Sequence, residues 1–289
     1  MSDSASSSAL PAKPDFDALA ARLMTLQQKI RAAKVPVVLV LEGWEAAGKG
    51  SVLGKLLQGL DPRGYKVHVI DAPDREERRY PLLKRYWEAM PAQGNLSIFL
   101  KSWYRTVSDA CLEEDVSKPE LERRYEDILQ MESQLACDGA VLLKCFLHIT
   151  RKEQKKRFKA LEEKKHTRWR VTAQDWEQNR QYDRLMKLYD DMMERTHRQG
   201  ALWHVLQGKE GKACAAQLYE LLIHALEQAL RQREQGDRLW DAPVLPGVKS
   251  LPTVPISPLS GFDPTLSLEG EDKAQLDARK KSLRRLHNA

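Results

Sequence analysis

One stretch of the chain restricts its fold more than any other. An apolar run, VPVVLVL at 35–41, is followed at once by EGWEAAGKGS at 42–51. A continuous β-branched run is typical of a strand buried on both faces, and the glycines indicate a turn before a helix. The spacing G-x-x-x-x-G-K is typical of loops whose backbone N–H groups surround phosphate oxygens at a helix N-terminus. The sequence therefore predicts a phosphate-binding loop, with contacts from Gly43, Ala46, Ala47, Gly48, Lys49, Gly50 and Ser51.

Two positions in this loop bear on phosphate transfer. Lys49 would place a positive charge beside the group being transferred, which makes it the first catalytic candidate. The next residue is Gly50, whereas many nucleotide-binding loops place Ser or Thr there, whose hydroxyl binds magnesium. The loop thus predicts that phosphate is bound and leaves open whether it is transferred.

Strands alternate with helices along most of the chain, which predicts right-handed crossovers and a parallel sheet. Besides 35–41, strands are expected at 65–72, 95–100, 140–149 and 201–207. Helices are expected at 16–34, 49–60, 76–90 with a kink near Pro81, 118–139 and 211–234. The predicted fold class is α/β, a three-layer P-loop kinase fold with helices on both faces of the sheet and a helical lid at about 151–199.

The length of 289 residues suits one large α/β domain with appendages. We expect a disordered lead over 1–15, the kinase-like domain over 16–235 and a Pro-rich linker over 236–270. Residues 271–289 have a helical pattern similar to that of 16–34, which leads into the first strand. Two interpretations of this end stay open: a coiled tail, or the first helix of a second copy of the domain.

Positive charge is concentrated in the predicted lid. The chain has a formal net charge of +6, and residues 151–170 hold ten Lys and Arg residues against three Glu. Such a run is either a solvated helix face or a docking surface for a polyanion. Charge alone leaves nucleic acid, nucleotide and inorganic polyphosphate open as partners.

Other features exclude several classes of protein. No apolar run is long enough to span a bilayer, and the N-terminus lacks the basic and apolar regions of a signal peptide. The four cysteines have neither metal-binding nor disulfide spacing, and the histidines are scattered over unrelated elements. We therefore expect a cytoplasmic protein without a membrane partner and without a His or Cys metal site.

Several ordered motifs between about residues 16 and 232 resemble the polyphosphate kinase 2 family of P-loop phosphotransferases. They are EGWEAAGKG at 42–50, DAPDREERRYPLLKRYW at 71–87, SWY at 102–104, EQKKRF at 153–158, RWRVTAQDWE at 168–177 and YDDMMERT at 189–196. The family's loop has glycine after the lysine, which Gly50 matches. The resemblance implies phosphate transfer between inorganic polyphosphate and a nucleoside mono- or diphosphate, AMP or ADP, with Mg²⁺ as cofactor and no nucleic acid partner.

Some members of this family carry two fused copies of the domain and act on AMP. The wording of the EGWEAAGKG motif and the helical pattern at 271–289 resemble the first copy of such a tandem. The resemblance therefore implies either a homo-oligomer or association with a second catalytic copy.

The resemblance also assigns roles to individual residues. Glu45 stands at the family's loop aspartate, so it is implied to be catalytic and to be the Mg²⁺ ligand. Lys101 stands at the arginine of the motif D-R-S-W-Y-N-R, and Arg168 at the arginine of R-W-K; both are implied to be catalytic. Because the basic lid is expected to face the loop, further phosphate contacts are expected from Lys155, Lys156 and Arg170.

The sequence departs from the family where the chemistry takes place. Leu100 stands at the aspartate of D-R-S-W-Y-N-R, which resembles a Mg²⁺ ligand, and leucine offers no oxygen to a hard cation. Leu161 stands at a lid arginine of R-F-x-x-R. Two functions stay open: a phosphotransferase with degenerate motifs, and a catalytically silent module that binds polyphosphate or nucleotide, or acts as a scaffold. A nucleoside-phosphate kinase that uses only ATP is a third, weaker alternative.

Four aromatic residues lie within these motifs. Trp103 and Tyr104 are expected to pack in the core rather than to stack on bases. Trp169 and Trp176 are expected to make core contacts between helices of the lid.

Overall fold

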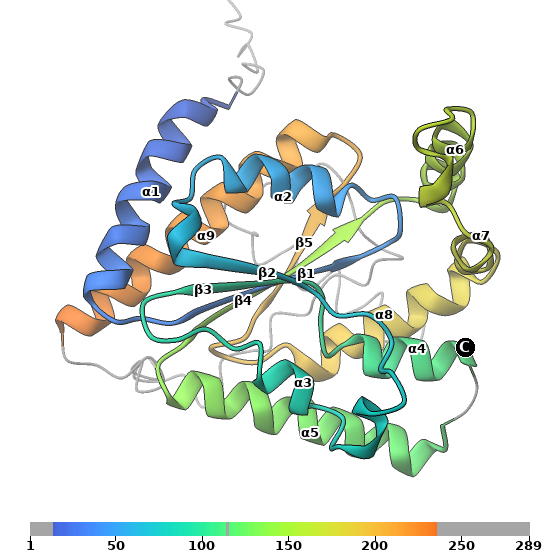
Figure 1. Ribbon diagram of the computed structural model, residues 1–289, viewed down its shortest axis with the longest axis horizontal. Coiled ribbons are helices and arrows are strands. Elements are labelled where there is room, and N and C mark those ends of the chain that lie inside the picture. The colour runs from blue at the N-terminus through green and yellow to red at the C-terminus, as the bar shows by residue number, and fades with distance from the viewer. Residues whose placement is uncertain (1–13, 114–115, 236–289) are drawn as a thin grey trace, which may run out of the picture.

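The computed structural model describes residues 14–113 and 116–235 (Figure 1). The predicted linker at 236–270, the predicted helix at 271–289 and nearly all of the predicted lead lie outside the described residues. Five parallel strands form one sheet in the order β2-β3-β1-β4-β5. They are β1 (Val37–Gly43), β2 (Tyr65–Val69), β3 (Leu96–Lys101), β4 (Val141–His148) and β5 (Trp203–Gln207).

The central strand β1 explains why the apolar run has no polar face. Val37 pairs with Leu96 of β3 on one side and with Val141 of β4 on the other. The side chains from Val37 to Leu41 are completely buried. A strand with neighbours at both edges and helices over both faces buries every side chain, so its sequence is continuously apolar rather than alternating.

Helices cover both faces of the sheet, as Figure 1 shows. On one face lie α1 (Phe16–Ala32), α2 (Lys49–Leu57) and α9 (Gly211–Glu234), with α9 packed against the other two. On the other face lie α3 (Lys84–Trp87), α4 (Arg105–Glu113), α5 (Lys118–Cys137) and α8 (Tyr182–Thr196). The predicted three-layer α/β arrangement is confirmed.

The predicted lid divides into two parts. The helices α6 (Arg151–Glu162) and α7 (Ala173–Arg180) stand beside the layers in Figure 1, with a 3₁₀ turn over Arg168–Arg170 between them. Helix α8, by contrast, packs against α4 and α5 through buried side chains that include Met192 and Met193. The prediction of a lid through residue 199 therefore extends too far, because the amphipathic helix α8 buries its apolar face in the core.

The predicted helix over 76–90 is wrong. The structure has a 3₁₀ turn over Glu77–Arg79 and the single helical turn α3. Tyr80, which precedes Pro81, is extended, with φ −108° and ψ 162°. A proline lacks an N–H donor and disfavours the helical conformation of the residue before it, so the helix is interrupted rather than kinked at this point.

Two further local differences concern the edge strand and the segment after β3. Strand β2 ends at Val69 instead of residue 72, after a register shift against β3 between His68 and Val69. Helix α4, which follows Tyr104 directly, was not predicted. In the described part of the chain, no helix combines the length and the apolar character needed to cross a membrane.

Candidate phosphate-binding site

The predicted phosphate-binding loop joins the end of β1 to the start of α2. Gly43 has a φ of 133°, and Gly48, which caps α2, has a φ of 99°; both values lie in the left-handed region that favours glycine. Space also excludes a side chain at position 43, because a Cβ atom there would lie 2.3 Å from the carbonyl oxygen of Leu147. The backbone path therefore requires both glycines of the motif, and it ends at the positive N-terminus of α2.

Lys49 folds back over this loop. Its ammonium donates hydrogen bonds to the carbonyl oxygens of Gly43 (2.8 Å) and Trp44 (3.1 Å), and lies 3.6 Å from a carboxylate oxygen of Glu45. Gly50 and Ser51 follow in the first turn of α2, and both are exposed. A side chain at position 50 would meet no other atom within 4 Å, so the fold itself does not require glycine there.

Glu42, at the end of β1, joins the loop to the end of β3. One of its carboxylate oxygens accepts hydrogen bonds from the backbone N–H (2.9 Å) and the hydroxyl (2.6 Å) of Ser102. Burial raises the pKa of Glu42, although the hydrogen bonds from Ser102 and the charge of Lys49 oppose the rise. The sequence analysis missed this residue, although it directly precedes the first glycine of the motif.

Three cations act on the carboxylate of Glu45. Lys49 has the largest effect and lowers the pKa of Glu45 against the opposing effect of burial; Arg105 and Lys101 lower it further. Lys101 forms an ion pair with Asp71, whose pKa it lowers. The structure thus brings together three of the predicted catalytic residues, and Arg105 joins them as a further cation near Glu45.

The residues at this site do not fit the Mg²⁺ ion that the resemblance implies. Leu100, at the position of the expected carboxylate, is half-buried and packs against the apolar core. The carboxylates of Glu45 and Asp71 are compensated by Lys49 and Lys101, and a divalent cation would add charge beside these ammonium groups. Among residues 14–113 and 116–235, no group of three or more His, Cys, Asp or Glu side chains is arranged to hold a metal ion. We therefore assign no step of the chemistry to a metal.

Trp44 anchors the loop in the core from below. Its completely buried ring stacks on Tyr182 of α8, with ring centroids 4.0 Å apart, and meets the edge of Tyr189. Its indole N–H donates a hydrogen bond to Nδ1 of His148, at 3.2 Å. Helix α8, which was predicted as lid, therefore supports the phosphate-binding loop from inside the domain.

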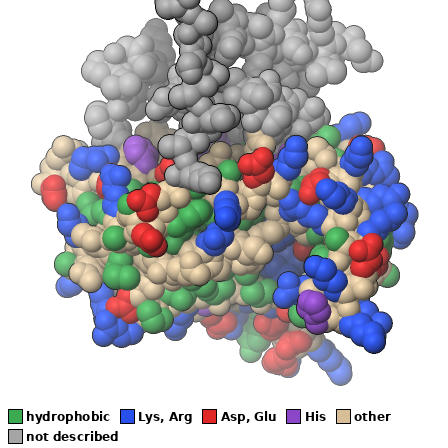
Figure 2. Space-filling model, turned by 90° about the horizontal axis from the view of Figure 1, so that it is seen from above, with side chains coloured by type: hydrophobic (Ala, Val, Ile, Leu, Met, Phe, Trp, Pro, Cys, Tyr) green, Lys and Arg blue, Asp and Glu red, His purple; other side chains and the backbone are tan. Residues whose placement is uncertain are grey.

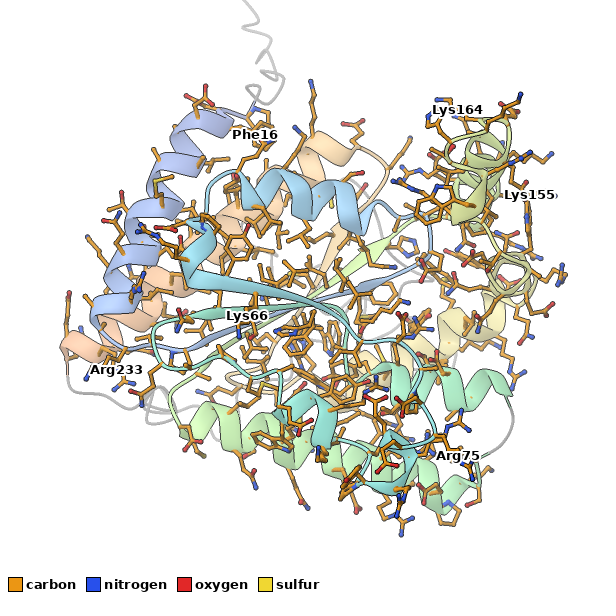
Figure 3. All side chains as sticks on the ribbon, viewed as in Figure 1. Phe16, Lys66, Arg75, Lys155, Lys164 and Arg233 are labelled. Atoms are coloured by element: carbon orange, nitrogen blue, oxygen red, sulfur yellow. The ribbon has the colours of Figure 1, made fainter. Side chains whose placement is uncertain are left out.

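The predicted lid cations form no hydrogen bond or ion pair with the described residues of the loop. Lys155, Lys156, Arg168 and Arg170 are all exposed, and none of them forms an ion pair with a described residue. Figure 3 shows Lys155 on the side of α6 that faces away from the sheet. In Figure 2, Lys and Arg side chains gather at the side of the molecule where the lid lies.

A different lid cation, Arg157, does reach the loop, where its guanidinium donates hydrogen bonds to the carbonyl oxygens of Ala46 (3.0 Å) and Ala47 (3.1 Å). It lies in the quoted motif EQKKRF and forms an ion pair with Glu153, one turn earlier in α6. The sequence analysis missed its role.

Of the four aromatic residues predicted to pack, three do so and one does not. Trp103 and Tyr104 are buried, which confirms that they pack in the core. Trp176 contacts Phe158 of α6 and donates a hydrogen bond to Glu162, so the predicted contact between lid helices is confirmed there. The prediction for Trp169 is wrong: this side chain is 70% exposed, beside the guanidinium of Arg170.

A parallel sheet with helices on both faces, and a glycine-bounded loop between its central strand and a helix, define a P-loop kinase fold. A sequence model of the family "Polyphosphate kinase 2 (PPK2)" matches residues 9–234. The chain belongs to the polyphosphate kinase 2 family.

Curated relatives and solved structures agree with this assignment. The chain is 31% identical over 206 residues to a polyphosphate:AMP phosphotransferase of Pseudomonas aeruginosa, covering 71% of this chain and 42% of the relative. It is 30% identical over 212 residues to an ADP-polyphosphate phosphotransferase of the same species, covering 73% of this chain and 68% of the relative. A crystal structure of polyphosphate kinase 2 from Arthrobacter aurescens TC1 has a TM-score of 0.70 and 31% identity, covering 74% of this chain and 77% of that one.

A putative polyphosphate kinase 2 from Pseudomonas aeruginosa PA01 has a TM-score of 0.72 and 31% identity to this chain. The match covers 75% of this chain but 48% of that one. The chain thus spans less than half the length of this structure and of the polyphosphate:AMP phosphotransferase from the same species.

Proposed function

We propose that this domain binds inorganic polyphosphate together with a nucleoside mono- or diphosphate, AMP or ADP, and transfers phosphate between them slowly. The observation that supports the proposal best is the ammonium of Lys49, held within a glycine-bounded loop at the N-terminus of α2. Membership of the polyphosphate kinase 2 family, and relatives named for transfer between polyphosphate and AMP or ADP, support the same substrates.

The work of the site then falls to cations and backbone groups. The loop amides and Lys49 bind the phosphate that is transferred, and Lys101 and Arg105 offset negative charge near Glu45. Transfer of a phosphoryl group depends mainly on positioning and on stabilising charge on the phosphate oxygens. The residues present supply positive charge but no complete metal site. We therefore expect measurable binding of phosphate and slow turnover.

A second candidate is a catalytically silent module that binds polyphosphate or nucleotide, or acts as a scaffold. The observation that favours it is Leu100, whose apolar side chain stands where the family places a carboxylate. The polyphosphate:AMP phosphotransferase of Pseudomonas aeruginosa is more than twice as long as the region that this chain matches, which leaves room for a second copy of the domain. We therefore also propose that the domain associates with a further copy, either of itself or of a catalytic domain. We propose the cytoplasm as its compartment, because all four cysteines are free thiols, as is usual in a reducing environment.

Binding and turnover of the purified chain test these candidates separately. Calorimetric titration with polyphosphate measures binding, and ADP formation from AMP and polyphosphate measures turnover, each with and without Mg²⁺. Detectable binding that Lys49→Ala weakens, together with turnover below about 1 per second, supports the proposal. Binding without any turnover supports the silent module, and the absence of binding contradicts both.

A further inference from the structure

The base of the lid is fastened to the backbone of the phosphate-binding loop by a saturated arginine. The guanidinium of Arg157 donates to the carbonyl oxygens of Ala46 (3.0 Å), Ala47 (3.1 Å), Gly208 (2.8 Å) and Lys209 (3.0 Å). Its Nε–H donates to Glu153 at 2.9 Å. An arginine side chain has five N–H donors, so each of them has a partner within the protein. None is left over for a phosphate oxygen.

A pair of glutamines holds the preceding residue of the loop. The backbone N–H of Glu45 donates to Oε1 of Gln178 in α7 (3.1 Å), and its carbonyl oxygen accepts from Nε2 of Gln154 in α6 (3.2 Å). Nε2 of Gln154 also donates to Oε1 of Gln178 (2.8 Å), and its Oε1 accepts from Asn179 (2.9 Å). Gln154 is completely buried and Asn179 is nearly so. A largely buried network of amide hydrogen bonds favours one arrangement of the groups it joins.

These contacts act where the loop backbone is strained. Ala46 has a φ of 59°, in the left-handed region that residues with a side chain rarely adopt. Its carbonyl oxygen and that of Ala47 both point to Arg157. In a planar trans peptide the N–H group points opposite to the carbonyl oxygen, so the contact at Ala47 turns the N–H of Gly48 to the other side of the loop. The lid thereby sets the direction of an amide that a phosphate-binding loop uses.

We propose that Arg157, Gln154 and Gln178 are positioning residues: they hold the loop in its anion-binding conformation and make no contact with phosphate themselves. The inference rests on the proposed binding of polyphosphate at this loop. It assigns Arg157 a different role from the exposed lid cations such as Lys155, because its charge is used inside the protein. Without these contacts a smaller fraction of the molecules has the binding-competent loop conformation. The apparent affinity for phosphate falls in proportion to that fraction.

The salt dependence of polyphosphate binding distinguishes a positioning role from a phosphate contact. Each cation that contacts phosphate adds about one to the slope of log affinity against log salt concentration, because counterions are released. Arg157→Lys keeps the charge but cannot serve five acceptors, and Arg157→Gln removes the charge. We expect both variants to lose affinity about tenfold or more while their salt slopes stay at the wild-type value. Lys49→Ala should instead lose about one from the slope.

A control variant and a direct measurement complete the test. Arg195→Lys makes the same exchange at an arginine of α8 that donates to Glu122 and Asp191, and it should bind polyphosphate like the wild type. Hydrogen exchange of the amides in 43–51 should be faster in Arg157→Lys than in the wild type. If either Arg157 variant fails to fold, as judged by thermal melting, Gln178→Leu takes its place. It removes the acceptor for the N–H of Glu45 and should lower affinity at unchanged slope.

Two results would overturn the inference. In the first, Arg157→Lys or Gln178→Leu binds polyphosphate with wild-type affinity. In the second, Arg157→Gln loses about one from the salt slope, which is the behaviour of a phosphate contact. A wild-type chain that does not bind polyphosphate contradicts the proposed function instead, so the two failures are distinguishable.

Discussion

A buried ion pair beside the end of β3 allows a quantitative prediction. Lys144 of β4 is completely buried, and its ammonium donates to Glu132 of α5 (2.8 Å), to the hydroxyl of Tyr104 (2.9 Å) and to the carbonyl oxygen of Thr196 (2.7 Å). Glu132 also accepts from Trp103 Nε1 (3.0 Å) and from the hydroxyl of Tyr104 (2.5 Å). All three donors of the ammonium have partners, so the pair is fully satisfied without water.

Replacing Lys144 with methionine would leave the carboxylate of Glu132 enclosed without a countercharge. Removing one partner of such a pair costs about 3–5 kcal/mol, which is a large part of the 5–15 kcal/mol that typically stabilises a domain. In the double variant Lys144→Met/Glu132→Gln, the amide oxygen still accepts from Trp103 and Tyr104, and no buried charge remains. We therefore expect the double variant to recover at least about 2 kcal/mol of the free energy of unfolding.

Urea unfolding followed by circular dichroism measures these differences, with equal slopes against urea as the check that the unfolded states are comparable. Glu88→Gln is the matched control, because the ion pair of Glu88 with Lys84 is exposed and should contribute less than about 1 kcal/mol. A single variant within about 1 kcal/mol of the wild type would refute the assigned role of the pair. So would a double variant less stable than the single one.

Three further predictions concern the metal, the lid and pH. Leu100→Asp should raise turnover about tenfold or more and make it dependent on Mg²⁺ in the ADP-formation assay; unchanged turnover would exclude Leu100 as the limiting residue. Lys155→Gln combined with Lys156→Gln should weaken binding of long polyphosphate but change tripolyphosphate binding less than about twofold, because both side chains are exposed and Lys155 faces away from the sheet; equal losses in calorimetric titrations would place them at the loop. Burial lowers the pKa of His148 from 6.5 to about 4, so the unfolded chain takes up this proton first. The free energy of unfolding should therefore fall as pH drops from 6.5 toward 4, and His148→Gln should reduce this slope by up to about 1.4 kcal/mol per pH unit in urea titrations; an unchanged slope would contradict the assignment.

Features set by short-range sequence were predictable. The apolar run at 35–41 identified the central strand, and the spacing of Gly43, Gly48 and Lys49 identified the loop, because both depend on backbone conformation within a few residues. The predicted ends of helices and strands were less accurate, since these ends depend on neighbouring elements. The interruption of the helix at Pro81 was also predictable from a local rule. The residue before a proline is disfavoured in a helix, and Tyr80 is extended.

Features set by the orientation of one element against another were not predictable from the sequence. Ten cations lie in residues 151–170, and nothing in their order alone says that Arg157 points toward the loop while Lys155 points away. That distinction depends on how α6 docks against the phosphate-binding loop. In the same way, the contact of Glu42 with Ser102 arises because the ends of β1 and β3 lie side by side in the parallel sheet.

The site therefore contains two groups of residues: those that shape the phosphate-binding loop, and those that would complete a metal site. The groups that shape the loop are intact: its glycines adopt the required conformations, Lys49 lies across it, and Arg157 and the glutamines hold its carbonyl and amide groups. Leu100 stands where the family resemblance implies a carboxylate that would complete a metal site. Binding of a polyanion depends mainly on the first group and on the cations, whereas fast transfer also requires charge stabilisation at the moving phosphate. A chain that keeps the first group and lacks the second should bind polyphosphate with an affinity that does not depend on its turnover in phosphate transfer. Affinity and turnover measured on the same preparation therefore distinguish a slow phosphotransferase from a silent binding module.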